Sequence, residues 1–265
     1  STNSGTQSGG TCAANGAELN SIGTLINQAV EDGAQIISIS QSDSDSSNEV
    51  KWAIANAVSR GVIIVASVGN NAKDENSNHL SRWSGVVGVS AINSDGTFAS
   101  YSSWGNGVVT AAVGGPYNTY DASTNEPTTV SGTSISTPLV AGMLALARQK
   151  WPDATANQIL QVLVNTGLDS THTWNQYTGY GAIDGGALVN TDPSQYPDEN
   201  PIIQKHGGSE PTVQEIQDYM DGIVFNSLAT FPSSYVYRGT EEVAALFDDT
   251  ELTVHLGTSP RYHRK

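Results

Sequence analysis

Residues 130–142, which read VSGTSISTPLVAG, place a serine where a reactive hydroxyl group would be useful. Ser134 follows a Gly-Thr turn and begins a helical pattern that carries Pro138 near its first turn. Unpaired backbone N–H groups and the positive end of the helix dipole would then lie beside the hydroxyl. That position stabilises the oxyanion that forms when a hydroxyl attacks a carbonyl group. The alternative is that Ser134 only caps the helix and that Gly132 only makes the turn.

A second segment, VASVGNN at residues 65–71, ends an apolar strand with a Gly-Asn pair. Ligands of open α/β sheets bind beyond the carboxyl ends of the strands, and the amide of Asn70 would donate two hydrogens into such a crevice. The alternative is an asparagine that simply follows Gly69 in a turn.

The elements that must position these residues alternate between helix and strand. Apolar residues recur at helical spacing over 22–30 and again over 50–58, and each helix is followed by a strand, at 35–40 and 62–67. The second strand is apolar without alternation, which is typical of a parallel sheet covered on both faces. We therefore predict an α/β fold with a doubly wound, mostly parallel sheet. The further strands expected are 86–92, 98–101 and 108–112, the further helices are 133–151 and 156–164, and 114–127 is expected to be a loop.

The compact pattern fades near residue 195, so we predict a main domain over residues 1–195 and a linker with a small C-terminal appendage over 196–265. Within the latter, 198–211 is rich in Pro and Gly and reads as the linker. Helices are expected at 213–226 and 241–247, and a short strand at 252–256.

Composition excludes several classes of protein. The chain has 11 Lys and Arg against 26 Asp and Glu, a net charge of -15, which argues against nucleic acid and anionic lipid as partners. No segment approaches the roughly 20 apolar residues of a membrane span. Cys12 is the only cysteine, so a disulfide framework and a cysteine-based zinc cluster within this chain are excluded. Cys12 is either a buried thiol or one half of a bridge to a partner elsewhere.

Together and in this order, GTSISTPLVAG and VASVGNN resemble the nucleophile and oxyanion segments of the subtilisin-like serine proteases, the subtilases. The resemblance covers roughly residues 20–190. It implies that Ser134 is the nucleophile and that Asn70 and the Ser134 backbone N–H hold the oxyanion. The implied reaction is hydrolysis of a peptide bond through an acyl-enzyme, with a histidine as the base.

The same resemblance implies a substrate pocket between two strand ends. IISIS followed by Gln41 and Ser42 resembles the strand that lines the P1 pocket. One wall would be Ser40, Gln41 and Ser42, and the other Ser67, Val68 and Gly69. Gln41 and Ser42 stand where Leu-Gly is common and add polar groups, which argues against a preference for large apolar P1 side chains. Leu139 stands where His is common, at a position that we expect to serve packing.

The sequence departs from the family pattern in its triad. Subtilases carry Asp, then His, then Ser along the chain, yet no Asp-Thr/Ser-Gly or His-Gly-Thr-His segment occurs here and no histidine precedes His79. Asp32 has the context of a helix end, and His79 that of a surface loop. We expect that the N-terminal third of the domain is missing from this chain. The alternatives are a split enzyme, whose second chain supplies Asp and His, and a pseudoprotease that only binds peptides.

The resemblance also bears on cofactors, partners and location. The chemistry requires no cofactor, and the partner is a protein or peptide substrate. Structural calcium is frequent in the family, but Asp43, Asp45 and Glu49, and likewise Asp74 and Glu75, match no ligand loop and read as solvated surface. A secreted or cell-surface protein is expected, and a bridge from Cys12 to an upstream cysteine would suit it.

Overall fold

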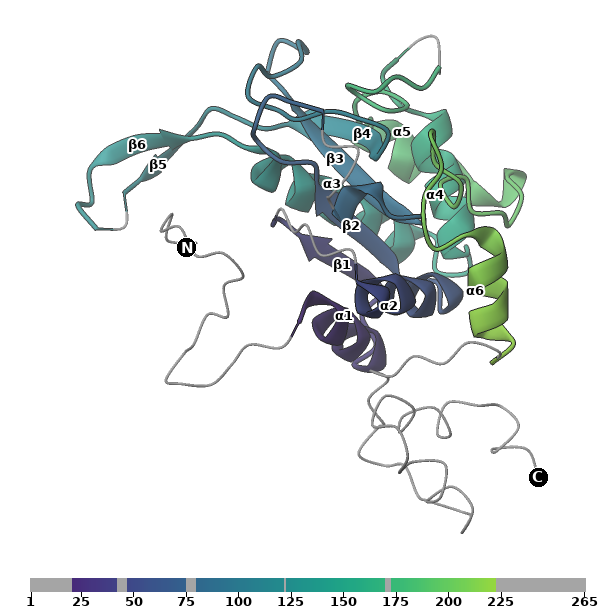
Figure 1. Cartoon of the computed structure of the whole chain (residues 1–265). Helices are drawn as coiled ribbons and strands as arrows, with labels where there is room; N and C mark the ends of the chain where they lie inside the picture. Colours follow the sequence, from purple (N-terminus) through teal and green to yellow (C-terminus); the bar gives the residue numbers. More distant parts are fainter. Residues whose placement is uncertain (1–20, 42–46, 75–79, 122, 170–172, 223–265) are drawn as a thin grey trace.

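The computed structural model describes residues 21–41, 47–74, 80–121, 123–169 and 173–222 (Figure 1). Four parallel strands form the central sheet in the order β1-β2-β3-β4. They are β1 (Ile36–Ile39), β2 (Ile63–Ser67), β3 (Val86–Ile92) and β4 (Val108–Val113). The helices are α1 (Ile22–Glu31), α2 (Asn48–Ser59), α3 (Thr133–Lys150), α4 (Ala156–Asn165), α5 (Gly185–Asn190) and α6 (Val213–Met220), with short 3-10 helices η1 (Leu80–Arg82) and η2 (Pro193–Gln195).

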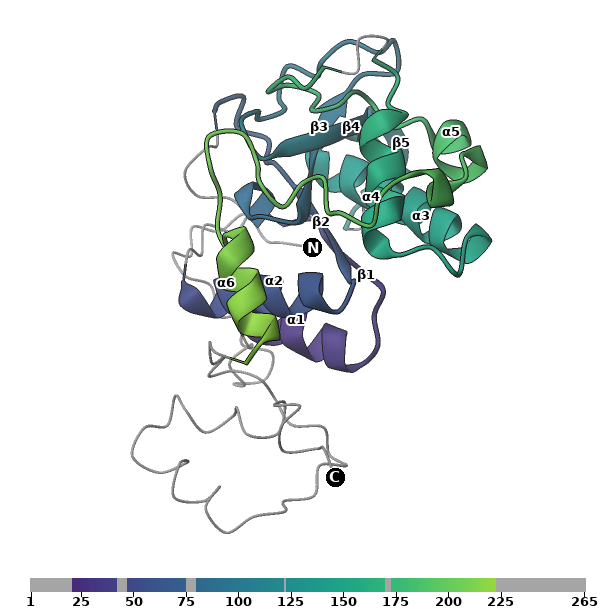
Figure 2. The same ribbon diagram turned by 90° about the vertical axis from the view of Figure 1, so that its right-hand side faces the viewer.

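Helices cover both faces of the sheet, as predicted. Figure 2 shows α1, α2 and α6 on one side and α3, α4 and α5 on the other. The buried side chains of β2 alternate between the two layers: Ile63 and Val65 pack toward α3 and α4, and Ile64 and Ala66 toward α1 and α2. All five residues of β2 are buried, which explains why its sequence is apolar without a period of two.

Local signals set the helix boundaries close to where the sequence places them. The Ser21 hydroxyl accepts a hydrogen bond from the Thr24 N–H, and Gly33, at φ +85°, follows the end of α1. Thr155 and Gln158 form a reciprocal capping box at the start of α4. Side-chain oxygens satisfy N–H groups that lack a partner within the first turn, so these residues fix the start of each helix.

Two sequence predictions about the strands are wrong. Residues 98–101 form no strand; Phe98 makes a single antiparallel bridge to Ile92 after a tight turn. The expected loop at 114–127 instead contains an antiparallel pair, β5 (Tyr117–Tyr120) and β6 (Pro127–Val130). All but one of the residues in this pair are exposed, so the hairpin lacks the apolar alternation that a sequence reading needs.

The position of Leu139 on α3 also differs from the prediction. Val140, Leu144 and Ala147 are fully buried against the sheet, whereas Leu139 is 39% exposed. Leu139 precedes Val140 by one residue, about 100° around the helix, so it points away from the core. Its expected packing role is therefore not observed.

Residues 196–222 lie against the main body and do not extend from it. Ile202 belongs to the same core cluster as α3 and α4. The buried Lys205 Nζ donates to the carbonyl oxygens of Ser81 and Gly107, and burial lowers the pKa of this amine to about 7. On α6, Tyr219 stacks on Trp52 of α2. The proposed domain boundary at residue 195 stays a prediction, but part of the expected linker is packed into the fold.

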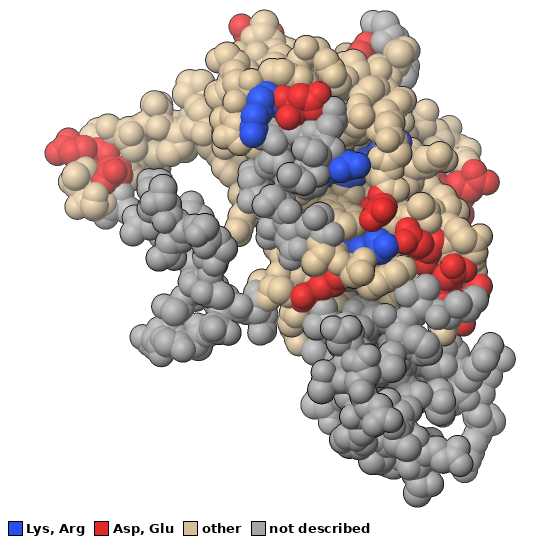
Figure 3. Space-filling model, viewed as in Figure 1, with Lys and Arg blue, Asp and Glu red and all other residues tan. Residues whose placement is uncertain are grey.

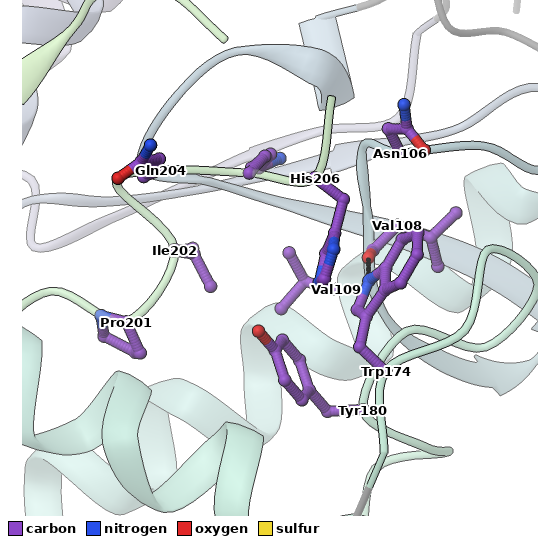
Figure 4. A pocket seen from close by; sticks show the side chains of 10 residues that line it. Asn106, Val108, Val109, Trp174, Tyr180, Pro201, Ile202, Gln204 and His206 are labelled. Carbon is purple, nitrogen blue, oxygen red and sulfur yellow. Dashed lines mark hydrogen bonds between the residues drawn. The ribbon is translucent and has the colours of Figure 1, made fainter. Parts of the chain in front are cut away.

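Figure 4 shows the junction where this C-terminal segment meets β4. The His206 ring stacks on Trp174 with 3.8 Å between ring centroids, and the Trp174 indole N–H donates to the Val108 carbonyl oxygen at 2.8 Å. The cavity between Tyr180 and Ile202 measures about 10 Å³, about the smallest space that holds one water. The junction is therefore a packed contact and offers little room for a ligand.

Acidic side chains dominate the charged groups on the face drawn in Figure 3, including the tip of the β5–β6 hairpin with Asp121 and Glu126. In the part of the chain that the structure describes, no helix has the length and apolar character needed to cross a membrane. Cys12 and the predicted elements at 241–247 and 252–256 lie outside the described residues, as do residues 223–226 of the expected helix at 213–226.

Candidate active site

Ser134 is the second residue of α3, and Gly132 is its N-cap. The Gly132 backbone is extended, with φ 161° and ψ 155°. The first N–H groups of a helix have no acceptor within it and carry the positive end of the dipole. Ser134 therefore contributes both a hydroxyl and a backbone N–H to the same electropositive end of α3.

We expected Pro138 near the first turn of α3. It is the sixth residue of the helix and so lies just beyond that turn. A proline nitrogen carries no hydrogen, so it cannot donate to the Ser134 carbonyl four residues earlier. The helix nevertheless continues to Lys150.

Asn70 follows β2 through Val68 and Gly69, and Gly69 has φ +99°, which favours glycine. The Asn70 Oδ1 atom accepts hydrogen bonds from the Thr133 N–H at 2.8 Å and from the Thr133 hydroxyl at 3.0 Å. Because a backbone N–H is only a donor, the oxygen of the amide must face Thr133, and the NH₂ group must point to the other side. Thr133 thus orients the donor end of Asn70.

Gly132 keeps the space between the two groups open. A Cβ built on Gly132 would lie 3.0 Å from Ser134 Oγ and 3.2 Å from Asn70 Nδ2. The hydroxyl and the amide donor therefore border the same small space, which any larger side chain at position 132 would fill.

The sequence predicted Ser134 and Asn70 as site residues. It did not predict that Thr133 orients Asn70 or that Gly132 keeps the space between Ser134 and Asn70 open. A threonine beside a candidate nucleophile carries no signal of its own. Its role depends on where the end of β2 lies relative to α3, which only the fold sets.

The residues predicted to line the P1 pocket lie at two neighbouring strand ends. Ile39, the last residue of β1, is in register with Ala66 of β2, so Ser40, which follows β1, and Ser67, the last residue of β2, lie at the same edge of the sheet. Ser40 and Gln41 are exposed, and Ser67, Val68 and Gly69 are buried. Ser42 lies outside the described residues. The pocket itself stays a prediction.

The remaining chemistry-bearing residues do not join this site. Asp32 is the C-cap of α1 and accepts a hydrogen bond from Gln28, so its predicted structural role is confirmed. His206 stacks on Trp174 at the C-terminal junction. His79, His172, His255 and His263 lie outside the described residues.

The candidate calcium residues are only partly described. Glu49 accepts a hydrogen bond from the Thr24 hydroxyl and thereby joins α2 to α1, while Asp74 is exposed. No group of three His, Cys, Asp or Glu side chains suited to a metal ion occurs among the described residues. Asp43, Asp45 and Glu75 fall outside them, and calcium binding remains untested.

Comparisons with known proteins point to one family. The model of the subtilase family (Peptidase_S8) matches residues 6–181. The thermostable alkaline protease of Halalkalibacterium halodurans is 32% identical over 172 residues, 64% of this chain and 45% of that protein. Subtilisin DY of Bacillus licheniformis is 31% identical over 162 residues, 60% of this chain and 58% of that protein. The chain thus spans about half the length of these relatives.

Solved structures agree on the fold. The crystal structure of fervidolysin from Fervidobacterium pennivorans matches with a TM-score of 0.55 and 29% identity, and covers 64% of this chain and 28% of that one. MycP1 from Mycobacterium smegmatis matches with a TM-score of 0.56 at 23% identity, over 66% of this chain and 54% of that one. Because the family model matches more than half of the residues, the chain belongs to the subtilase family and forms part of its catalytic domain.

Proposed function

We propose that this chain is the Ser-bearing part of a serine endopeptidase that hydrolyses proteins or peptides through an acyl-enzyme. The observation that carries the proposal is the shared space in front of Gly132. The Ser134 hydroxyl and the Asn70 amide donor border that space at the positive end of α3. A nucleophile and an oxyanion donor that face one small volume are what acyl transfer requires.

In the proposed reaction, Ser134 Oγ bonds to the carbonyl carbon of the substrate and passes its proton to an imidazole. The carbonyl oxygen becomes an oxyanion and accepts hydrogen bonds from Asn70 Nδ2 and the Ser134 N–H. Collapse of this intermediate breaks the peptide bond, and the leaving amine takes the proton. Water then hydrolyses the acyl-enzyme by the same steps.

The imidazole and its carboxylate partner come, in this proposal, from a segment outside these 265 residues, on the same polypeptide or on a second one. The acidic composition suits a secreted or cell-surface enzyme. The exposed Ser40 and Gln41 at the end of β1 support a P1 pocket that accepts small or polar side chains. Calcium, if bound, would be structural.

The alternative is a catalytically inactive module that binds peptides. It is favoured by the sequence itself, in which neither of the triad segments that carry Asp and His occurs. The two proposals make opposite predictions for the full-length natural protein.

The deciding experiment incubates the full-length protein with casein and follows the appearance of new amino termini. We expect hydrolysis by the wild type and its loss in Ser134→Ala. The matched control is Ser131→Ala, which removes an exposed hydroxyl three residues earlier and should leave the rate within twofold. A folded wild-type protein that binds casein without cleaving it would establish the inactive module.

A further inference from the structure

Residues 101–103, which lie between β3 and β4, contact the loop that carries Asn70. The Ser103 N–H donates to the Gly69 carbonyl oxygen at 2.9 Å, and the Ser103 hydroxyl accepts from the Asn71 N–H at 3.1 Å. The Tyr101 carbonyl oxygen accepts from the Ala72 N–H at 3.1 Å. Three hydrogen bonds therefore hold the backbone on both sides of Asn70.

The side chain of Tyr101 reaches the other half of the site. Its hydroxyl donates to the Gly114 carbonyl oxygen at 2.9 Å, and the same oxygen accepts the Gly132 N–H at 2.8 Å. A carbonyl oxygen has two lone pairs, so both bonds form together. A Cβ on Gly114 would collide with the Tyr101 hydroxyl, which shows how closely the phenol approaches this turn.

The segment is itself held firmly in the sheet layer. Ser102 and Ser103 are fully buried. The Ser102 hydroxyl accepts from the Ala91 N–H of β3 at 3.1 Å and donates to the Ser103 carbonyl oxygen at 2.9 Å. Burial raises the pKa of Tyr101, so its hydroxyl stays protonated at neutral pH and continues to donate.

We propose that Tyr101 is a positioning residue for acyl transfer: through Gly114 it fixes the turn before Ser134 relative to the loop that carries Asn70. This inference rests on the proposed function, because it concerns the same two reacting groups. Asn70 and Ser134 lie on different elements, and their separation depends on the contacts between those elements. A displacement of about 1 Å at a reacting group is enough to slow catalysis about 10²-fold.

The Tyr101→Phe variant tests the proposal because it removes only the hydroxyl and keeps the ring. The assay measures covalent reaction of the full-length protein with a fluorophosphonate probe and separates the maximal rate, kinact, from the concentration for half-maximal rate, KI. The loss of one hydrogen bond to a positioning carbonyl group predicts a fall in kinact of about two- to tenfold. We expect KI to stay within twofold, because the hydroxyl that is removed bonds to the Gly114 carbonyl oxygen and has no role in binding the probe in this proposal.

The matched control is Tyr120→Phe, which removes the hydroxyl of a tyrosine that is 66% exposed on β5 and should leave both constants unchanged. A second readout needs no activity: hydrogen exchange at the Gly132 amide, whose acceptor is the carbonyl oxygen that Tyr101 holds. We expect this amide to exchange faster in Tyr101→Phe than in the wild type or in Tyr120→Phe.

Each outcome has a separate meaning. If the wild type reacts and Tyr101→Phe has the same kinact, or if the whole change lies in KI, the positioning role is refuted. If the folded wild type does not react at all, the proposed function fails, and the exchange measurement alone judges Tyr101. Equal exchange at Gly132 in both proteins then overturns the inference.

Discussion

Replacing Asn70 by aspartate separates the chemical role of this residue from its structural one. The substitution keeps the size of the side chain and an oxygen that accepts the two hydrogen bonds from Thr133, at 2.8 and 3.0 Å. It exchanges the NH₂ donor for a second acceptor that carries negative charge. Asn70→Ala, by contrast, removes the donor and leaves Thr133 without its partner.

The two variants should differ in rate by an amount that follows from this geometry. Removal of one oxyanion donor lowers kcat by about 10²–10³-fold. The carboxylate introduced by Asn70→Asp adds a repulsion between like charges of up to about 4 kcal/mol at about 4 Å and an effective dielectric constant of about 20, although exposure to solvent reduces it. We therefore expect Asn70→Asp to react at least about 10³-fold more slowly than the wild type, and more slowly than Asn70→Ala.

Stability should follow the opposite order. A carboxylate near the start of α3 interacts favourably with the helix dipole, by about 0.3–1 kcal/mol, so Asn70→Asp should melt at or slightly above the wild-type temperature. The loss of hydrogen-bond partners in Asn70→Ala costs about 1 kcal/mol, or about 2–4 °C in Tm for a domain of this size.

The assay combines thermal unfolding with the fluorophosphonate reaction rate of the full-length protein. Asn118→Asp makes the same change of charge at an exposed position of β5 and should leave the rate within twofold. The assignment of Asn70 as oxyanion donor is refuted if Asn70→Asp reacts within tenfold of the wild type, or faster than Asn70→Ala.

Three further substitutions test other parts of the structure. Gly132→Ala fits the extended backbone but fills the space between Ser134 Oγ and Asn70 Nδ2, so the reaction with the probe should slow at least tenfold at unchanged Tm; an unchanged rate would contradict the shared space. The pKa of Lys205 falls from 10.5 to about 7 on folding, so the unfolded chain binds more protons between these values, and the free energy of unfolding should rise with pH across that window. Urea unfolding at pH 7 and 9 should show this rise in the wild type and in Lys150→Met, the control at an exposed lysine. The rise should be smaller in Lys205→Met. An equal change in the free energy of unfolding in all three proteins would refute the role of Lys205. Ile202→Ala should destabilise the main body by about 2–5 kcal/mol in urea unfolding, whereas a loss below about 0.5 kcal/mol would show that the C-terminal segment is separate.

The sequence predicted all four strands of the central sheet because the buried strands carry strong signals, although it also predicted a strand at 98–101 that does not form. The apolar run at 62–67 and the helical pattern after Gly132 predicted β2 and α3 to within a residue at each end. The sequence did not predict the hairpin β5–β6, because its residues are mostly exposed and polar. Its pairing depends on contacts that leave no periodic pattern in the sequence. The packing of Ile202 and Lys205 was not predicted for a related reason. A stretch rich in Pro and Gly resembles a linker even when a few of its residues are buried.

In the candidate site, too, residues with a local sequence signal were predicted and residues that act through long-range contacts were not. Ser134 and Asn70 were predicted because each stands at an element end with its own local signal, a helix start and a strand end, and the resemblance to the subtilases implied their roles. The other residues of the site act through contacts between residues as far as 63 positions apart; they are Thr133, Gly132 and Tyr101. No local sequence pattern indicates such contacts. These supporting residues could be identified only once the fold had brought β2, α3 and the 101–103 segment together.

The role of Ser134 as the nucleophile is tested most directly by identifying the residue that a fluorophosphonate probe modifies. The full-length native protein would be labelled, digested and mapped by mass spectrometry, with heat-denatured protein as the control for non-specific reaction. We expect one stoichiometric adduct on Ser134 of the folded protein and none after denaturation. An adduct on a different serine, or a folded protein that remains unlabelled, would contradict it.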